Sequence, residues 1–260
     1  MNRREFMALT AAGFASYALG PGSGNAGRDQ SQKMEIKAVA FDAFPIFDPR
    51  PVFAVAEELF PGNGATLSEE WRTRQFEYTW LRVLALRYAD FWQVTEDALT
   101  FAANKLKLDL SDEKREKLMS EYLNLKAWPD VPLALSALKK SGIRLALLSN
   151  LTPHMLQANI KSAGLTGIFE SVISTDQART FKPDPRAYQL SIESLGLQRN
   201  QILFVAFAGW DAAGAKLFGY PTFWVNRLKA PAEELGAVPD ASGGSLLDLV
   251  HFLHANANSG

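Results

Sequence analysis

Four short segments of the chain carry side chains that could work together as a chemical site. An apolar run ends on Asp42, and later segments carry Ser149, Asn150, Lys182 and Asp211. Proteins that alternate strands and helices bind ligands beyond the carboxyl ends of their strands, which is where Asp42 would lie. An aspartate can form a covalent ester, and a neighbouring ammonium favours its ionised form. The pattern predicts a nucleophilic Asp42, whereas a lone carboxylate after a strand would be a turn residue.

Composition excludes several other kinds of site. The chain has no cysteine and three histidines, which argues against disulfides, thiol catalysis, thiolate metal sites and a histidine-based triad. Its formal net charge is −1 and it has no basic stripe, which argues against nucleic acid as a partner. We therefore expect a small-molecule partner, no cofactor and no metal.

The first residues have the features of an export signal. Arg3 and Arg4 precede an uncharged, mostly apolar run from Phe6 to Leu19, and a stretch rich in small residues follows. This order is typical of a secretory signal peptide, and the arginine pair resembles a twin-arginine signal. The run is short for a membrane span, which needs about 20 apolar residues. We predict a signal peptide over 1–26, a periplasmic or exported protein, and no membrane association after signal removal; a chance arginine pair is the alternative.

The elements that would position the candidate site alternate along the chain. Strands are expected at 36–42, 143–149, 171–174, 202–206 and 222–225, and helices at 132–141, 154–163, 185–195 and 211–218. This alternation predicts an α/β fold with a doubly wound parallel sheet. Residues 49–128 are predicted to be mostly helical, with Ser68 as an N-cap and 112–127 as one further helix. A helical block after the first strand implies a cap over the strand ends.

These patterns divide the chain into segments. The predicted boundaries are a signal peptide over 1–26, a linker over 27–33, an α/β core domain over 34–48 and 129–255, a helical cap domain over 49–128, and a tail over 256–260.

Motifs in both the helical block and the core resemble one enzyme family. In the helical block the matching segments are 71–72, 75–82 and 95–99, and in the core they are 148–150, 182–184, 188 and 210–212. These motifs are similar to the haloacid dehalogenase superfamily, and specifically to the L-2-haloacid dehalogenases, over about residues 34–255. The resemblance implies a Rossmann-like haloacid dehalogenase core with an inserted helical cap domain.

The resemblance also implies a reaction and a catalytic role for each candidate. Asp42 would attack the halogen-bearing carbon of a short L-2-haloacid and release halide, and water would hydrolyse the resulting ester to a 2-hydroxy acid. Lys182 would keep Asp42 ionised. Arg72 would bind the substrate carboxylate or the halide, since an arginine on an apolar helix face needs an anion. Ser149 would hydrogen-bond a carboxylate, and Asp211 would hold Lys182 or position water.

Each of these roles has a plainer alternative. Lys182 could be a solvated loop lysine, and Arg72 could extend past the edge of the lid into water. Ser149 could be a turn residue after a strand, and Asp211 could cap the helix over 211–218.

The implied ligand is a small 2-haloacid or a related carboxylate. The substrate-binding positions carried over from the family are Phe44, Phe76, Phe91, Asn150, Tyr188 and Trp210. Aromatic residues at such spacing are also typical of an ordinary core. Relatives that transfer phosphate carry a second aspartate at the position of Phe44, which can neither ligate Mg²⁺ nor move a proton, so a phosphatase is disfavoured. A homodimer is typical of the family, and the lid could supply the surface.

Two segments depart from the family pattern. The loop after Asp42 is one residue shorter and lacks a hydroxyl, and Pro45 lacks a backbone donor. Ala206 and Ala208 replace a serine and an asparagine of the family motif, and losing one preorganised donor costs about 10²–10³ in rate. We therefore expect slow ester hydrolysis or none. The alternatives are a non-catalytic relative that binds small carboxylates, and an enzyme for another small acid, for which Phe207 leaves room.

Overall fold

Six parallel strands form the central sheet of the computed structural model, which describes residues 35–258. In spatial order they are β5 (Ser171–Ser174), β4 (Arg144–Ser149), β1 (Ala38–Phe41), β6 (Ile202–Ala206), β7 (Thr222–Val225) and β8 (Ala241–Gly243). The chain builds outward from β1 first to one side and then to the other, so the strand order reverses at β1. Ligands bind at such a switch point in doubly wound sheets. The predicted signal peptide and linker lie outside the described residues.

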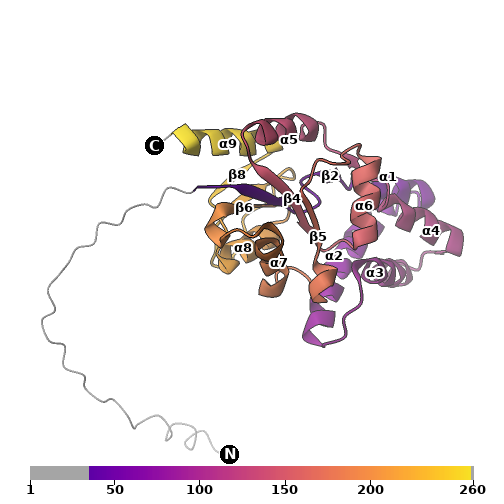
Figure 1. Cartoon of the computed structure of the whole chain (residues 1–260). Helices are drawn as coiled ribbons and strands as arrows, with labels where there is room; N and C mark the ends of the chain where they lie inside the picture. The colour runs from indigo at the N-terminus through magenta and orange to yellow at the C-terminus, as the bar shows by residue number, and fades with distance from the viewer. Residues whose placement is uncertain (1–34, 259–260) are drawn as a thin grey trace, which may run out of the picture. The chain divides into compact units, whose positions relative to one another are not determined.

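Helices cover both faces of this sheet (Figure 1). On one face lie α5 (Val131–Lys140), α6 (Pro153–Ser162) and α9 (Leu246–Asn258), and on the other lie α7 (Pro185–Leu195) and α8 (Gly209–Phe218). Alternate residues of β1 point to opposite faces of the sheet. Val39 and Phe41 pack in the layer of α5, α6 and α9, while Ala38 and Ala40 pack in the layer of α7 and α8. All four are fully buried, which explains why the strand reads as a continuous apolar run.

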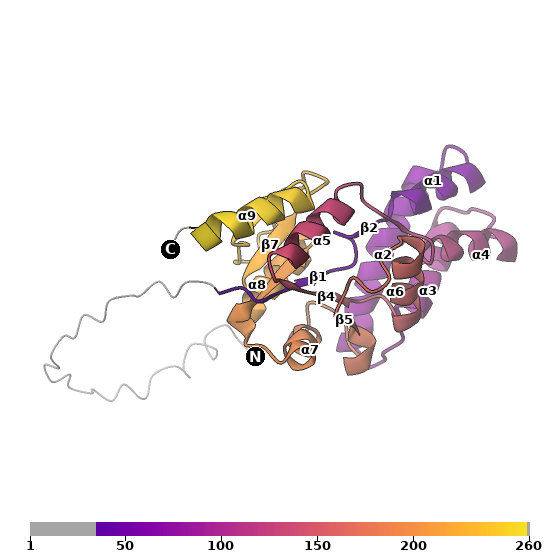
Figure 2. The same cartoon turned by 45° about the horizontal axis from the view of Figure 1, so that its top comes forward.

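A helical block is inserted between β1 and β4 (Figure 2). It comprises α1 (Arg50–Leu59), α2 (Gly64–Leu84), α3 (Phe91–Lys105) and α4 (Asp112–Glu121). A short antiparallel ladder of β2 (Phe47–Asp48) and β3 (Lys126–Ala127) joins the two chain crossings between the block and the sheet. Within the block, buried Trp71 donates from Nε1 to the Thr95 carbonyl at 2.8 Å, which ties α2 to α3.

The α/β fold with a doubly wound parallel sheet is confirmed, but several element boundaries differ from the prediction. Ser68 is not an N-cap, because α2 begins at Gly64 and the Ser68 hydroxyl donates to the Gly64 carbonyl inside the helix. A Cβ at Gly64 would lie 2.2 Å from the Glu57 Cα, so the helix starts where only glycine lets α1 approach. The helix expected over 112–127 ends at Glu121, because the buried side chain of Asn159 binds the backbone of the following turn.

Some elements carried no clear signal in the sequence. The structure adds β8 and α9, along with the 3₁₀ turns Thr175–Ala178 and Arg199–Gln201. Over residues 35–258 no helix combines the length and apolar character that crossing a membrane requires.

Candidate active site

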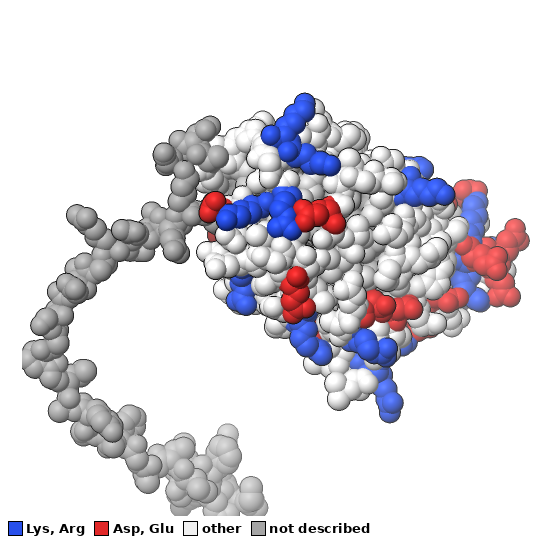
Figure 3. Space-filling view, viewed as in Figure 1, with Lys and Arg blue, Asp and Glu red and all other residues white. Residues whose placement is uncertain are grey.

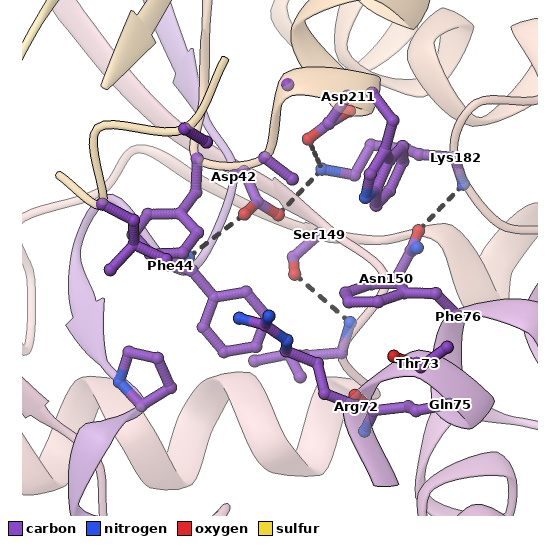
Figure 4. A pocket seen from close by; sticks show the side chains of 18 of the residues that line it. Asp42, Phe44, Arg72, Thr73, Gln75, Phe76, Ser149, Asn150, Lys182 and Asp211 are labelled. Carbon is purple, nitrogen blue, oxygen red and sulfur yellow. Dashed lines mark hydrogen bonds and ion pairs between the residues drawn. The ribbon is translucent and has the colours of Figure 1, made fainter. Parts of the chain in front are cut away.

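Asp42 lies directly after β1, at the point where the strand order reverses. The backbone N–H of Asp42 donates to the Val205 carbonyl of the neighbouring strand at 2.9 Å, which fixes its direction. Asp42 as a whole residue is 7% exposed, and it lines a cavity. The N–H of Phe44 donates to Asp42 Oδ2 at 3.2 Å. The carboxylate is therefore largely buried while lining the cavity, and Figure 4 shows it bound by Lys182 on one side and by Phe44 on the other.

A buried ammonium bridges two carboxylates next to this cavity. Lys182 Nζ lies 2.8 Å from Asp42 Oδ1 and 2.6 Å from Asp211 Oδ2. Lys182 is 1% exposed, so both ion pairs lie in a region of low dielectric. From the other side, the Tyr188 hydroxyl donates to Asp211 Oδ1 at 2.7 Å. The predicted proximity of Asp42, Lys182 and Asp211 is what the geometry shows.

The ionisation of these groups follows from burial and from their neighbours. Burial alone would lower the pKa of Lys182, but the carboxylates of Asp211 and Asp42 outweigh it and raise the pKa above its ordinary value. Burial raises the pKa of Asp211 to about 6, against the opposing effect of Lys182 and with a further rise from the charge of Asp42. Lys182 therefore stays charged at neutral pH, while Asp211 is a carboxylate that can exchange a proton there.

The loop that carries Lys182 is held by polar contacts on both sides. Asn150 Oδ1 accepts the Lys182 N–H at 2.9 Å and the Thr175 hydroxyl at 3.2 Å. Trp80 of α2 donates from Nε1 to the Lys182 carbonyl at 3.3 Å. Asn150 lines the cavity as expected for a substrate-binding residue, but its side-chain oxygen is already occupied in positioning the lysine.

Ser149 and Arg72 reach the same cavity from different elements. Ser149 ends β4, and its Oγ accepts the Leu151 N–H at 3.2 Å, which leaves the hydroxyl hydrogen free for a ligand. Arg72 comes from α2 and lines the cavity, and no carboxylate of residues 35–258 lies within salt-bridge distance of its guanidinium. Figure 4 shows it reaching inward from the helical block. The cavity thus combines an unpaired cation with a buried carboxylate.

The cavity has a volume of about 450 Å³ and is enclosed mainly by aromatic rings. Phe76 and Trp80 of α2 meet Trp210 of α8, with ring centroids 5.3 Å and 5.5 Å from the Trp210 ring. Phe44 lies on the wall at the side of Asp42, and Phe91 contributes a largely buried ring. These aromatic contacts join the helical block to the core around the site.

Two predicted site residues hold different places from those expected. Tyr188 does not line the cavity, because it is fully buried behind Asp211 and serves that carboxylate instead. Asp211 is not the N-cap of α8, because the helix begins at Gly209 and its N-cap is Ala208. Asp211 therefore lies in the first turn, where the positive end of the helix favours a carboxylate.

The departures from the family motif lie at the floor of the site. Ala206 is fully buried at the end of β6, and Ala208 lines the cavity. Neither side chain can donate or accept a hydrogen bond, and the side-chain acceptors of the Lys182 ammonium among the described residues are the carboxylates of Asp42 and Asp211.

Sequence reasoning missed other residues of the cavity wall. Gln75, Trp80 and Trp128 line it, along with Arg50. Trp80 stands in the same helical motif as Arg72, so the periodicity of α2 points to it. Trp128 has no such signal, because it is brought to Phe44 by a contact across 84 residues.

The chain matches the family model of haloacid dehalogenase-like hydrolases over residues 36–219. It is 44% identical over 223 residues to the (S)-2-haloacid dehalogenase of Pseudomonas sp. (strain YL), covering 85% of this chain and 96% of that relative. Among solved structures, L-2-haloacid dehalogenase RSc1362 superposes with a TM-score of 0.83 at 44% identity, covering 85% of this chain and 99% of that one.

A second solved structure adds a chemical observation. It is the L-2-haloacid dehalogenase of Xanthobacter autotrophicus with chloropropionic acid covalently bound, at a TM-score of 0.77 and 37% identity, covering 84% of this chain and 98% of that one. With a family model over most of the sequence and relatives aligned nearly end to end, the chain belongs to the haloacid dehalogenase-like hydrolases, and within them to the (S)-2-haloacid dehalogenase family.

Proposed function

We propose that this protein hydrolyses the carbon–halogen bond of short L-2-haloacids and releases 2-hydroxy acids through an ester on Asp42. The observation that carries the proposal is the buried Asp42–Lys182–Asp211 arrangement, which opens on a cavity that also contains Arg72. The relatives named as (S)-2-haloacid dehalogenases and the covalently bound chloropropionic acid of the Xanthobacter enzyme support it.

The first step is displacement at carbon. A carboxylate oxygen of Asp42 attacks C2 of the acid, a C–O bond forms, and the C–halogen bond breaks with its electron pair leaving as halide. Burial strips water from the nucleophile, and the Lys182 ammonium lies 2.8 Å from its Oδ1. Arg72 supplies positive charge for the substrate carboxylate or the departing halide, and Ser149 can donate a hydrogen bond.

The second step is hydrolysis at the ester carbonyl of Asp42. Water adds to that carbon and gives one proton to Asp211, whose raised pKa suits a base near neutral pH. The Asp42 oxygen that did not attack becomes the oxyanion, and it keeps its present hydrogen bond. The donor is the Lys182 ammonium for Oδ1 or the Phe44 N–H for Oδ2. Cleavage of the acyl C–O bond, with the second water proton passing to the leaving oxygen, then frees the 2-hydroxy acid and restores the Asp42 carboxylate, and Asp211 returns its proton to solvent.

A second candidate is a weak or inactive dehalogenase-like protein that binds small carboxylates. Ala206 and Ala208 favour it, because two positions beside the ester offer only methyl groups. Removal of a preorganised donor costs about 10²–10³ in rate, so turnover would be slow even if the first step proceeds.

Halide release tests the proposal directly. The purified protein is incubated with L-2-chloropropionate and with D-2-chloropropionate, and chloride is measured over time. Chloride from the L-acid alone, and none from an Asp42→Asn variant, is the expected result. Saturable binding of 2-chloropropionate without chloride release from either enantiomer would select the carboxylate-binding protein instead.

We further propose that residues 1–26 direct export by the twin-arginine route, with Arg3 and Arg4 as the arginine pair.

Residues 49–128 would act as a cap that closes the cavity over the core, which the Trp80–Lys182 and Phe76–Trp210 contacts support. The exposed side chains of Leu81, Leu84 and Leu86 offer an apolar surface on this block for a homodimer.

A further inference from the structure

The cavity is larger than a short 2-haloacid requires. Its volume of about 450 Å³ falls in the range of about 300–1,000 Å³ that holds drug-sized ligands, whereas 2-chloropropionate has only three carbons. The wall of this cavity includes Phe53 of α1, Trp128, Phe207 and Leu228, and we call the part that they line the aromatic lobe. These four residues come from four separate segments of the chain, so the lobe is a product of the fold rather than of one motif.

Phe44 connects the aromatic lobe to the reacting carboxylate. Its N–H donates to Asp42 Oδ2 at 3.2 Å, and its ring lies 6.1 Å from the Phe207 ring. The Phe207 ring lies in turn 6.4 Å from that of Trp128. A substrate whose C2 lies at Asp42 therefore has a continuous aromatic surface along which its side chain can extend.

The walls of the lobe are fixed in place before any ligand arrives. Trp128 donates from Nε1 to the Phe44 carbonyl at 2.9 Å, and Trp224 donates from Nε1 to the Phe207 carbonyl at 3.0 Å. The Arg50 guanidinium lies over the Trp128 ring at 4.4 Å. Preorganised walls reduce the ordering cost of binding, which favours a ligand that fills the space.

The charges around the lobe favour an uncharged occupant. Arg50 forms a bidentate ion pair with Asp48, and Arg227, whose guanidinium also lies over the Trp128 ring at 4.6 Å, pairs with Asp130, so both charges are already compensated. Glu233 lines the same cavity and packs against the start of α8, where a Cβ at Gly209 would lie 2.9 Å from its Cγ. No cation of residues 35–258 lies within salt-bridge distance of Glu233. A second carboxylate on the substrate would be repelled here, whereas an apolar group would be accepted.

We propose that the cavity binds 2-haloacids whose side chain is an aryl group or a longer alkyl chain, with that side chain in the aromatic lobe. This proposal rests on the proposed function, because Asp42 must perform the displacement. Each additional buried methylene should raise kcat/KM about fourfold, since the transfer free energy of a methylene converts to that factor. The gain should appear in KM and leave kcat similar, because the lobe contacts the substrate and the transition state equally.

The test compares (S)-2-bromopropionate with (S)-2-bromohexanoate and (S)-2-bromo-3-phenylpropionate by bromide release. We expect kcat/KM to be at least about tenfold higher for the two larger acids, and lower for 2-bromoglutarate than for 2-bromohexanoate. Equal or lower values for the two larger acids would overturn the proposal while leaving dehalogenation of the small acid intact.

A variant that fills the aromatic lobe, compared with a control variant outside it, tests the role of the lobe. Leu228 is 56% exposed, so Leu228→Trp should fold while placing a large ring in the lobe. It should reduce the ratio of kcat/KM for bromohexanoate over bromopropionate at least about fivefold. Leu217→Trp, at a 66% exposed position of α8 outside this cavity, should leave the ratio unchanged. An unchanged ratio in Leu228→Trp would count against the lobe.

A binding measurement separates the two proposals. Calorimetry compares propionate with 3-phenylpropionate on the wild-type chain and on Asp42→Asn, neither ligand being able to react. Binding of 3-phenylpropionate at least about tenfold tighter supports the lobe even if no halide is ever released, in which case the dehalogenase function itself has failed. Equal affinities would overturn the lobe even if bromopropionate is turned over.

Discussion

Lys182 sets the chemistry of the site because its buried ammonium lies between the carboxylates of Asp42 and Asp211. Two carboxylates near each other repel, and the ammonium between them makes both charges tolerable. A buried pair of this kind is costly to break, because the partner left behind keeps its charge without compensation. The same side chain therefore contributes to both stability and reactivity.

Replacing Lys182 should show this double contribution. Lys182→Met should abolish halide release and lower the free energy of unfolding by about 3–5 kcal/mol, measured by chemical denaturation. Lys216→Met is the matched control, because Lys216 pairs with Asp240 at a partly exposed position. Its cost should stay within about 1 kcal/mol. Equal costs for the two variants would argue against the buried pair as described.

Asp211 should set an acidic limit on turnover. Its pKa is raised to about 6 by burial, so the carboxylate that accepts a proton from water is lost as the pH falls below that value. We expect kcat to rise with pH through an apparent midpoint near 6, and an Asp211→Asn variant to have low kcat without that midpoint. A kcat that is constant between pH 5 and pH 8 would remove Asp211 from the role of base.

The charged residues of the site could be predicted from the sequence, whereas the aromatic residues of the cavity wall could be predicted only in part. Asp42 follows an apolar strand and Lys182 stands in a segment that resembles the family motif, so their proximity was foreseeable. Tyr188 was misplaced because a sequence does not show that its phenol turns behind Asp211. Trp128 went unnoticed because its position depends on contacts with distant residues rather than on a local pattern.

At the scale of elements, the site depends on how closely α8 packs against the loop of Lys182. Gly214 makes this approach feasible, since a Cβ there would lie 2.7 Å from both Pro183 Cβ and the Tyr188 hydroxyl oxygen.

The strands were predictable because buried parallel strands read as apolar runs, and β5, β6 and β7 have the predicted bounds. The start of α2 could not be predicted, because it depends on the contact between Gly64 and α1.

Adding one methyl group to α8 should therefore disturb both packing and catalysis. Gly214→Ala should lower the free energy of unfolding by about 1–3 kcal/mol, because the interior is overfilled. It should also reduce kcat by displacing Tyr188 from Asp211. Gly244→Ala is the control, since Gly244 is exposed and a Cβ there has no neighbour within 4 Å. Wild-type stability and kcat in Gly214→Ala would contradict this account of the packing.

At the scale of the whole molecule, the chain joins a sheet domain to a helical block and precedes both with a basic-apolar segment. On the face in Figure 3, basic and acidic side chains are interspersed over the described residues, without one extended basic stripe. The presence of a helical block between β1 and β4 was foreseeable from the change in periodicity. The packing of the block on the core was not, because it depends on contacts such as that of Trp80 with the Lys182 carbonyl.

Export should depend on the arginine pair. Replacing both Arg3 and Arg4 by lysine should leave the protein in the cytoplasm of a bacterial host with a twin-arginine system, measured by fractionation and by the mass of the N-terminal peptide. The unaltered chain should appear in the periplasm without residues 1–26. Recovery of the full-length chain in the cytoplasm in both cases would rule out the signal.

The ester on Asp42 is the central claim, and trapping it is the most direct test. An Asp211→Asn variant lacks the proposed base, so a reaction with (S)-2-chloropropionate should stop after the first step. We predict release of one chloride per chain and a carboxyethyl group on the peptide that contains Asp42, identified by mass spectrometry of the digested protein. Chloride release with an unmodified Asp42 peptide, or a carboxyethyl group on another residue, would contradict the account.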